Sequence, residues 1–397
     1  MALDRLGSNA IADLAVSAAD IAAGTITTAQ IANDAVTTAK IADSVNLGRR
    51  NVVINGAMKI AQRSTSAVAA ANGLNTVDRW KHFESGAGAF TTQRVADHPT
   101  GTGYSLKCQV TTADTSIASN EYAFTETNLE GQDCQRFQYG TSNAKPITVS
   151  FWVKSNKTGI YCVALYKHAG AGTAYMYRKE FTISAANTWE KKVVTISPTA
   201  GSTSLITASA AAVPNTTAMG LSLTIGLAWG SNYHGTDDTW QTGSGYGTSN
   251  QVNWMDSTSN NFYLTEVQME AGDTATPFEH LSVAEDLYNC YRYYYSFKTD
   301  SQNGLLLCHQ DRNTDTYIGQ VVMPTEMRAA PTVTHTGMDR VHKPGVRYDT
   351  LSSGPQFSFL HSQAITFTIV TTSSDATSQT VYFGASSGGT IDITAEL

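Results

Sequence analysis

The sequence has few charged residues and no cluster of basic ones. Asp, Glu, Lys and Arg make up 15% of the chain, against about a quarter of an average globular protein. The formal net charge is −7, and no run of Lys or Arg provides the clustered phosphate contacts that nucleic acids require. We therefore expect no nucleic-acid partner and no binding to anionic membranes.

Long apolar runs are also missing. No stretch approaches the roughly 20 apolar residues of a membrane helix, and the first residues do not form a signal peptide. We expect a soluble chain that is made in a cytoplasm and not inserted into a membrane. The five cysteines are scattered and include no C-x-x-C spacing, so free buried thiols are expected rather than a disulfide framework or a zinc site. Neither a cofactor nor a metal is predicted. The cysteines are Cys108, Cys134, Cys162, Cys290 and Cys308.

With so little charge, the polar surface must come from Thr, Ser, Asn, Gln and Gly. Apolar residues still make up 41% of the 397 residues, enough for two or three cores. This composition favours strands and turns over helices.

The N-terminal region repeats itself every ten residues, as in "ITTAQIANDAVTTAKIAD". An apolar residue falls at every fifth position, a spacing that gives neither a helical stripe nor one face of a strand. One copy has too few apolar residues to offset the backbone entropy of ordering, about 1–2 kcal/mol per residue. Identical copies are the simplest partners, so residues 1–47 predict a stalk in a parallel bundle; the alternative is a disordered linker. The row consists of Ile11, Val16, Ile21, Ile26, Ile31, Val36 and Ile41.

Residues 48–281 have a different pattern: short segments in which apolar and polar residues alternate, separated by turn residues. The best strand pair is "PITVSFWVKSNKTGIYCVALY", in which Ile147, Val149, Phe151 and Val153 alternate with polar residues and "KSNKTG" is a turn. Many short strands of this kind predict an antiparallel β-sandwich.

Three motifs in this region carry a resemblance. They are "NGAMKIAQR", "DRW" and "VQMEAGDTATPFE". Together they resemble modules of bacteriophage tail fibres, and the N-terminal repeats are similar to those of marine podovirus fibres. The resemblance implies a jelly roll like that of carbohydrate-binding modules, in a trimer carried on a virion tail. The matching residues are Asn55, Gly56, Gln62, Arg63, Asp78, Arg79, Trp80, Gln268, Glu270, Gly272, Ala275, Thr276, Pro277, Phe278 and Glu279.

Charged residues among these matches are expected to be structural, since buried charges need partners. We predict one buried ion pair between Asp78 and Arg79, beside Trp80. We predict another between Arg63 and either Glu270 or Glu279.

The loop from Trp229 to Trp254 is the richest in aromatic and polar residues. Trp, Tyr and Asn on Gly-rich loops are a frequent contact set of binding surfaces. Trp229 and Trp254 are expected in the core at its two ends. Asp237 and Asp238 raise the alternative of a Ca²⁺ site, but the full ligand spacing is absent. His234 near Asp237 has no partner nucleophile, so no catalytic residue is predicted. The candidate glycan-binding residues are Tyr233, His234, Asp237, Asp238, Trp240 and Tyr246.

Residues 282–297 predict a short helix followed by a strand. Ser282 and Glu285 have the spacing of a capping box, and apolar residues follow at Ala284, Leu287, Tyr288 and Tyr291. One such helix per chain is expected to help clamp a trimer. Residues 298–397 predict a small all-β tip, with clear alternation over 365–369 and a last hairpin at Gly388-Gly389.

The leading hypothesis is a homotrimeric viral tail fibre that binds a host surface polysaccharide without cleaving it. Several weak sites on one particle would then act by avidity. The N-terminal stalk is expected to dock on a tail adaptor, nozzle or baseplate protein. Two alternatives stay open: a depolymerase that cuts capsule or lipopolysaccharide, and a purely structural virion spike.

Overall fold

The computed structural model describes residues 49–397 with gaps at 71, 75, 171, 244, 300–305, 312–314, 344–345, 359, 373–379 and 385–388. The chain divides into two units, residues 1–47 and residues 48–397. The stalk predicted over residues 1–47, with its row from Ile11 to Ile41, lies outside the described residues and stays a prediction.

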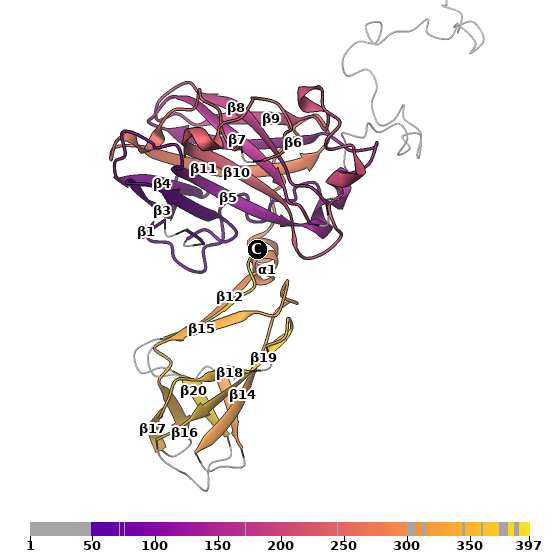
Figure 1. The fold of residues 1–397 in the computed structure, drawn as a ribbon. Helices are drawn as coiled ribbons and strands as arrows, with labels where there is room; N and C mark the ends of the chain where they lie inside the picture. The colour runs from indigo at the N-terminus through magenta and orange to yellow at the C-terminus, as the bar shows by residue number, and fades with distance from the viewer. Residues whose placement is uncertain are drawn as a thin grey trace, which may run out of the picture. The chain divides into compact units, whose positions relative to one another are not determined.

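Two antiparallel sheets form a β-sandwich over the region predicted to be a jelly roll (Figure 1). The six-stranded sheet has the order β1 (Val68–Ala69), β3 (Ala89–Val95), β4 (Ser105–Thr112), β11 (Asn261–Ala271), β6 (Ile147–Ser155) and β9 (Glu190–Ile196). The five-stranded sheet has the order β2 (Lys81–Ser85), β5 (Tyr122–Glu130), β10 (Met219–Trp229), β7 (Gly159–Lys167) and β8 (Tyr175–Ile183).

The alternation seen in the sequence is confirmed by burial. Phe151 of β6 and Val163 of β7 are 0% exposed, as are Leu223 and Ile225 of β10. Side chains of a strand point to its two faces in turn, so each sheet turns one row toward the other. Each large apolar side chain buried in this way contributes about 1.5–3 kcal/mol.

The prediction of β6 and β7 as a strand pair needs a correction. Both strands exist, but β6 pairs with β11 and β9, whereas β7 pairs with β10 and β8. The "KSNKTG" segment therefore carries the chain from one sheet to the other. Alternation reports only which face a residue takes, so it does not identify the neighbouring strand.

Short helices connect the strands. The α-helix α1 (Val283–Tyr291) begins at Ser282, and both hydrogen bonds of the predicted capping box are present with Glu285. Its buried residues are Asp286 and Cys290. Of the predicted apolar stripe, Ala284 and Tyr288 are exposed, whereas Leu287 and Tyr291 are partly buried. The 3₁₀ segments among the described residues are η4 (Gly131–Phe137), η5 (Ala200–Ser202), η6 (Ser209–Ala211), η7 (Ser231–Tyr233) and η8 (Trp254–Asp256).

The residues after α1 form two further antiparallel sheets with a separate core. One has the order β12 (Tyr294–Thr299), β21 (Gly389–Thr394) and β15 (Thr332–Thr336). The other has the order β17 (Val346–Thr350), β16 (Arg340–Lys343), β20 (Thr380–Gly384), β13 (Leu306–Gln310), β14 (Thr316–Val322), β19 (Ala364–Val370) and β18 (Gln356–Ser358). The predicted last hairpin is wrong, because β20 and β21 lie in different sheets.

The predicted ion pairs use other partners. Asp78 forms an ion pair with Arg63 at 3.7 Å. Arg79 pairs with Glu396 rather than with Asp78. Arg63 also lies 3.3 Å from Glu396. Neighbouring charges in sequence point in different directions here, so residues remote in the chain supply the counter-charges.

Glu270 and Glu279, the partners predicted for Arg63, bind backbone amides instead. Glu270 accepts from the amide of Thr276 at 2.9 Å, and Glu279 from that of Asn51 at 2.8 Å. Both acids therefore fix the chain after β11 by hydrogen bonding.

Candidate functional site

The outer face of the five-stranded sheet carries most of its partly exposed aromatic residues. Antiparallel register places Phe83 of β2 opposite Phe124 of β5, and Phe124 opposite Gly226 of β10. The neighbouring row joins Lys81, Glu126 and Thr224 across the same strands. An aromatic row and a polar row thus lie side by side on one face, which we call the ring face.

Four rings of the ring face form a continuous stack. The centroids of Phe83 and Phe124 are 4.9 Å apart, those of Phe124 and Trp229 5.0 Å, and those of Trp229 and Tyr246 4.9 Å. Their planes differ by 26°, 21° and 18° in turn. Gly226 makes room for this stack, because a Cβ there would lie 2.1 Å from the indole nitrogen of Trp229.

Further rings border the stack. Tyr122 and Tyr233 meet edge to face at 5.5 Å, and both lie against Trp229. On the other side, Tyr166 of β7 lies 6.4 Å from Tyr246. All but Trp229 are partly exposed, so their rings are available to a ligand.

Glu126 and Lys81 supply the charges beside the rings. Glu126 accepts a hydrogen bond from the hydroxyl of Thr224 at 3.1 Å. Burial raises the pKa of Glu126, against the opposing effects of Thr224 and Lys81. Burial likewise lowers the pKa of Lys81, and Glu126 opposes that shift. Burying either charged side chain is thus unfavourable, and hydrogen bonds from a ligand to the charged form of Glu126 or Lys81 would stabilise it.

A chain of hydrogen bonds continues the polar row. The hydroxyl of Ser222 donates to Oδ1 of Asn128 at 2.5 Å, and its oxygen lies 2.6 Å from Nε2 of His168. A serine hydroxyl has a single hydrogen, so Nε2 of His168 must be the donor of the second bond. Burial, with Lys167 and Lys81, lowers the pKa of His168 to about 4. The neutral ring therefore keeps Nδ1 as an acceptor.

This combination suits a polyhydroxylated ring. Stacked aromatic faces pack against apolar C–H surfaces, while a few placed polar groups fix orientation. Glu126 and Nδ1 of His168 accept from hydroxyl groups, and Lys81 donates to them.

The six candidates from the sequence are divided by the structure. Tyr233 and Tyr246 lie on the ring face. His234 is beside it, with Nε2 3.0 Å from the backbone oxygen of Trp229. Trp240 is 1% exposed and donates to the backbone oxygen of Ser197 at 2.9 Å, so it belongs to the core and not to a ligand surface.

Asp237 and Asp238 are held at the edge strand β8. Asp237 accepts from the backbone amide of Glu180 at 2.8 Å, and Asp238 from the hydroxyl of Tyr177 at 2.6 Å. Lys179 pairs with both carboxylates, at 3.4 and 3.0 Å. These contacts give both acids a structural role in anchoring the loop.

Several ring-face residues were not predicted from the sequence. Phe83, Phe124, Glu126 and Tyr166 come from three strands that are distant along the chain, and His168 directly follows β7. The signal that was available is the alternation in "YAFTETNLE", which puts Tyr122, Phe124 and Glu126 on one face. Trp254 is 0% exposed in the core, as predicted, and Trp229 is 7% exposed under Tyr246.

The described residues show no sign of a metal site or of a membrane-spanning helix. No group of three or more His, Cys, Asp or Glu side chains among them is arranged to hold a metal ion. Within the same residues, no helix has the length and apolar character to cross a membrane.

Comparison with known proteins gives distant structural likenesses alone. No protein-family model matches the sequence, and no curated protein sequence matches it. The structure is similar to the enzymatically active domain of tailspike protein 4 of bacteriophage CBA120, with a TM-score of 0.28 and 11% identity over 56% of this chain and 21% of that one. The aligned part thus spans about a fifth of the tailspike chain.

Carbohydrate-binding modules give similar values. The family 11 module of Clostridium thermocellum, solved with a β-1,3-1,4-mixed-linked tetrasaccharide, has a TM-score of 0.27 and 11% identity over 50% of this chain and 91% of that one. TmCBM61, solved with β-1,4-galactotriose, has a TM-score of 0.26 and 10% identity over 56% and 99% of the two chains. At such values the likenesses do not identify a ligand for this chain.

Proposed function

We propose that this chain binds a glycan on the ring face and serves as a receptor-binding fibre of a bacteriophage. The observation that carries the first part is the stack of Phe83, Phe124, Trp229 and Tyr246 beside Glu126 and Lys81. A buried core needs no such stack on the outer side of a sheet. Partly exposed aromatic rows on a soluble protein mark a binding surface.

Binding without cleavage is the form of this proposal that the charges favour. Glycoside hydrolysis uses two carboxyl groups about 5–9.5 Å apart. Glu180 on the ring face is three strands away from Glu126, which at about 4.8 Å per strand gives about 14 Å. Glu130 lies four residues along the strand, about 13 Å away, and is bound to Arg292.

The viral part of the proposal depends on the sequence. The motifs around Asn55, Trp80 and Pro277 resemble those of tail fibres, and the ten-residue repeats predict self-association. The tip adds an observation in favour of oligomers: Leu307, Ile318, Val322 and Tyr382 are exposed on one face of the seven-stranded sheet. We propose a homotrimer on the virion tail, attached through its N-terminus to a tail adaptor, nozzle or baseplate protein.

The glycan proposal is tested with the fluorescently labelled full chain and polysaccharide isolated from candidate host cells. We expect saturable binding, and a loss of at least about tenfold in affinity for Tyr246→Ala and Phe124→Ala. Tyr104→Ala is the matched control, because Tyr104 is 39% exposed and has no contact with the stacked rings. Unchanged binding in both ring-face variants would refute the site.

The same assay separates the alternatives. Shortened polysaccharide chains after incubation would establish a depolymerase. Absence of binding to host cells and to every isolated polysaccharide would favour a structural spike. The trimer is tested by measuring the mass of the intact chain in solution, with a chain lacking residues 1–47 beside it. A monomeric intact chain would contradict the stalk prediction.

A further inference from the structure

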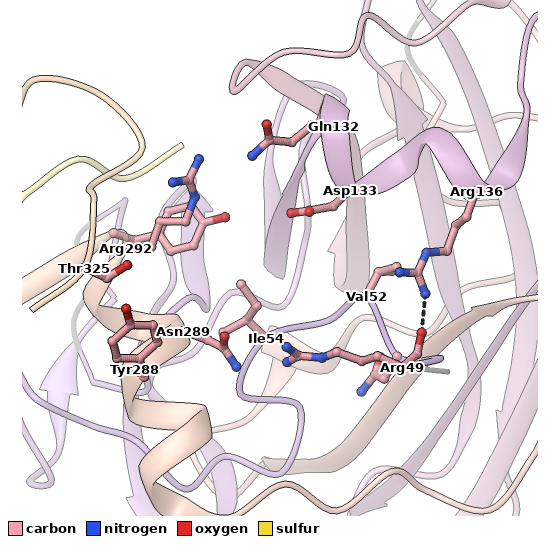
Figure 2. Close-up of a pocket in the computed structure, with 12 residues that line it drawn as sticks. Arg49, Val52, Ile54, Gln132, Asp133, Arg136, Tyr288, Asn289, Arg292 and Thr325 are labelled. Carbon is pink, nitrogen blue, oxygen red and sulfur yellow. Dashed lines mark hydrogen bonds between the residues drawn. The ribbon is translucent and has the colours of Figure 1, made fainter. Parts of the chain in front are cut away.

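A hollow elsewhere on the molecule shares no lining residue with the ring face. Its volume is about 360 Å³, and it is lined by Arg49 at the start of the described chain, by Asp133 and Arg136 of η4, and by Tyr288 and Asn289 of α1 (Figure 2). This is within the size range of pockets that hold small molecules.

Three groups in the hollow have hydrogen-bonding capacity that the described residues do not use. The guanidinium of Arg49 and the carboxylate of Asp133 have no hydrogen bond or ion pair with any of these residues. The amide nitrogen of Asn289 is buried and has no partner among them. Figure 2 shows Arg49 extending toward Asn289, and Asp133 pointing into the hollow from η4. Two donors and one acceptor therefore face the same space.

The charges in the hollow do not balance. Arg292, a further guanidinium in its wall, is already neutralised by Glu130 through a contact of 2.7 Å. The cations Arg49 and Arg136 then face the single carboxylate of Asp133. Among the lining residues and Glu130, one positive charge is in excess. Glu285 and Asp286 of α1, outside the lining, also act on Arg49, so the hollow matches a ligand with no more than one negative charge.

A carboxylate fits this excess better than a phosphate does. Guanidinium groups bind both anions in a forked geometry, but phosphate monoesters carry a charge of about −1.5 to −2 at pH 7. A single carboxylate would neutralise the site, whereas a phosphate monoester would leave it negative.

The remaining lining residues favour a sugar that bears a carboxylate group. The ring of Tyr288 is 52% exposed at the rim, and Asp133 offers acceptor oxygens for hydroxyl groups. An aromatic surface with acceptors suits a polyhydroxylated ring. An acidic peptide side chain would use the donors Arg49 and Asn289, but unlike a sugar it brings no hydroxyl group to donate to Asp133.

We propose that this hollow is a binding site for a carboxylated sugar of the hexuronate class. The carboxylate binds Arg49 and the amide of Asn289, the ring packs on Tyr288, and Asp133 accepts from the hydroxyls. The proposal is independent of the ring face, with which the hollow shares no lining residue.

The test is saturation-transfer and titration NMR on the full chain with methyl β-glucuronide and, as the neutral match, methyl β-glucoside. We expect the glucuronide to bind at least about tenfold more tightly. Arg49→Met is expected to remove that preference, because the shape of the side chain is kept and the charge is lost. Lys191→Met on β9 is the control for loss of a positive charge elsewhere, and it should leave the preference unchanged.

Each further arm either supports or overturns the site. Tyr288→Ala should weaken glucuronide binding several-fold at an unchanged melting temperature. Tyr246→Ala should leave glucuronide binding unchanged, so failure of the ring-face proposal and failure of this one can be told apart. Equal binding of glucuronide and glucoside would overturn the proposal, as would full binding by Arg49→Met. Tighter binding of N-acetylglutamate than of the glucuronide would overturn the assignment to a sugar.

Discussion

Arg292 donates hydrogen bonds from Nε and Nη2 to the two carboxylate oxygens of Glu130, at 2.7 and 2.8 Å. Glu130 ends β5 of the sandwich and its side chain is 0% exposed. The hydroxyl of Tyr293 donates to the same carboxylate at 2.6 Å. Hydrogen bonding to Glu130 raises the pKa of Arg292. The pair joins the sandwich to the chain that follows α1.

Arg292→Met is expected to destabilise the protein by about 3–5 kcal/mol, because it leaves a buried carboxylate without its counter-charge. The free energy of unfolding in denaturant measures this cost. The double variant Glu130→Gln/Arg292→Met should recover part of the loss, since its buried amide is neutral. A cost below about 1 kcal/mol for Arg292→Met would mean that the pair behaves like an exposed ion pair.

The strands of this fold could be predicted from the sequence, but not which strands are neighbours. Alternation at Val149 and Phe151, and at Ile365 and Phe367, correctly marked the buried rows. The pairing of β6 with β11, more than 100 residues later, depends on contacts that no local pattern encodes. The stalk row from Ile11 to Ile41 lies outside the described residues and stays a prediction.

Only part of the candidate site could be predicted from the sequence, because local patterns do not encode which strands are neighbours. Tyr233 and Tyr246 stood out because they are aromatic residues on a Gly-rich loop. Trp240 has the same local context, yet its indole is 1% exposed in the core. Phe83 and Phe124 escaped notice because antiparallel pairing of β2 with β5 brings them together. A binding face assembled from several strands is a property of the register, which local sequence does not contain.

Gly226→Ala is expected to damage the ring face without breaking the sandwich. Its Cβ would lie 2.1 Å from the indole nitrogen of Trp229, so the indole must move and the stack with Tyr246 must open. Overpacking of this kind costs about 1–3 kcal/mol. We expect glycan affinity to fall at least about tenfold, measured by titration. Val149→Ala, on the inner side of β6, is the control. It should lower the free energy of unfolding by a similar or larger amount and leave glycan affinity unchanged.

The five cysteines are expected to be unreactive in the folded protein. All are buried, and burial raises the pKa of Cys162 to about 11 and that of Cys308 to about 12. The thiolate is the nucleophile, so almost none is present at pH 8. A chromogenic disulfide reagent should detect no thiol in the native protein and five after unfolding. A fast-reacting thiol in the native state would show that a cysteine is accessible.

His82 gives the sandwich a predictable response to acid. The side chain is 0% exposed, and neither ring nitrogen has a hydrogen-bond partner among the described residues. Burial lowers the pKa of His82 from 6.5 to about 3. The unfolded chain therefore takes up a proton below about pH 6.5, while the folded chain does not until about pH 3. The free energy of unfolding is therefore unaffected by protonation of His82 above pH 6.5, and it decreases as the pH falls from about 6.5 to about 3.

Replacing His82 by leucine should remove this dependence. Between pH 7 and pH 5 the linkage corresponds to about 2 kcal/mol, so the stability of His82→Leu relative to the parent should rise by that amount at pH 5. At pH 7 we expect little change or a gain, because leucine leaves no unpaired polar group in the core. Unfolding in denaturant at both pH values gives the two differences, with His361→Leu at an exposed position as the control. Equal differences at pH 7 and pH 5 would show that His82 is protonated, or solvated, in the folded protein.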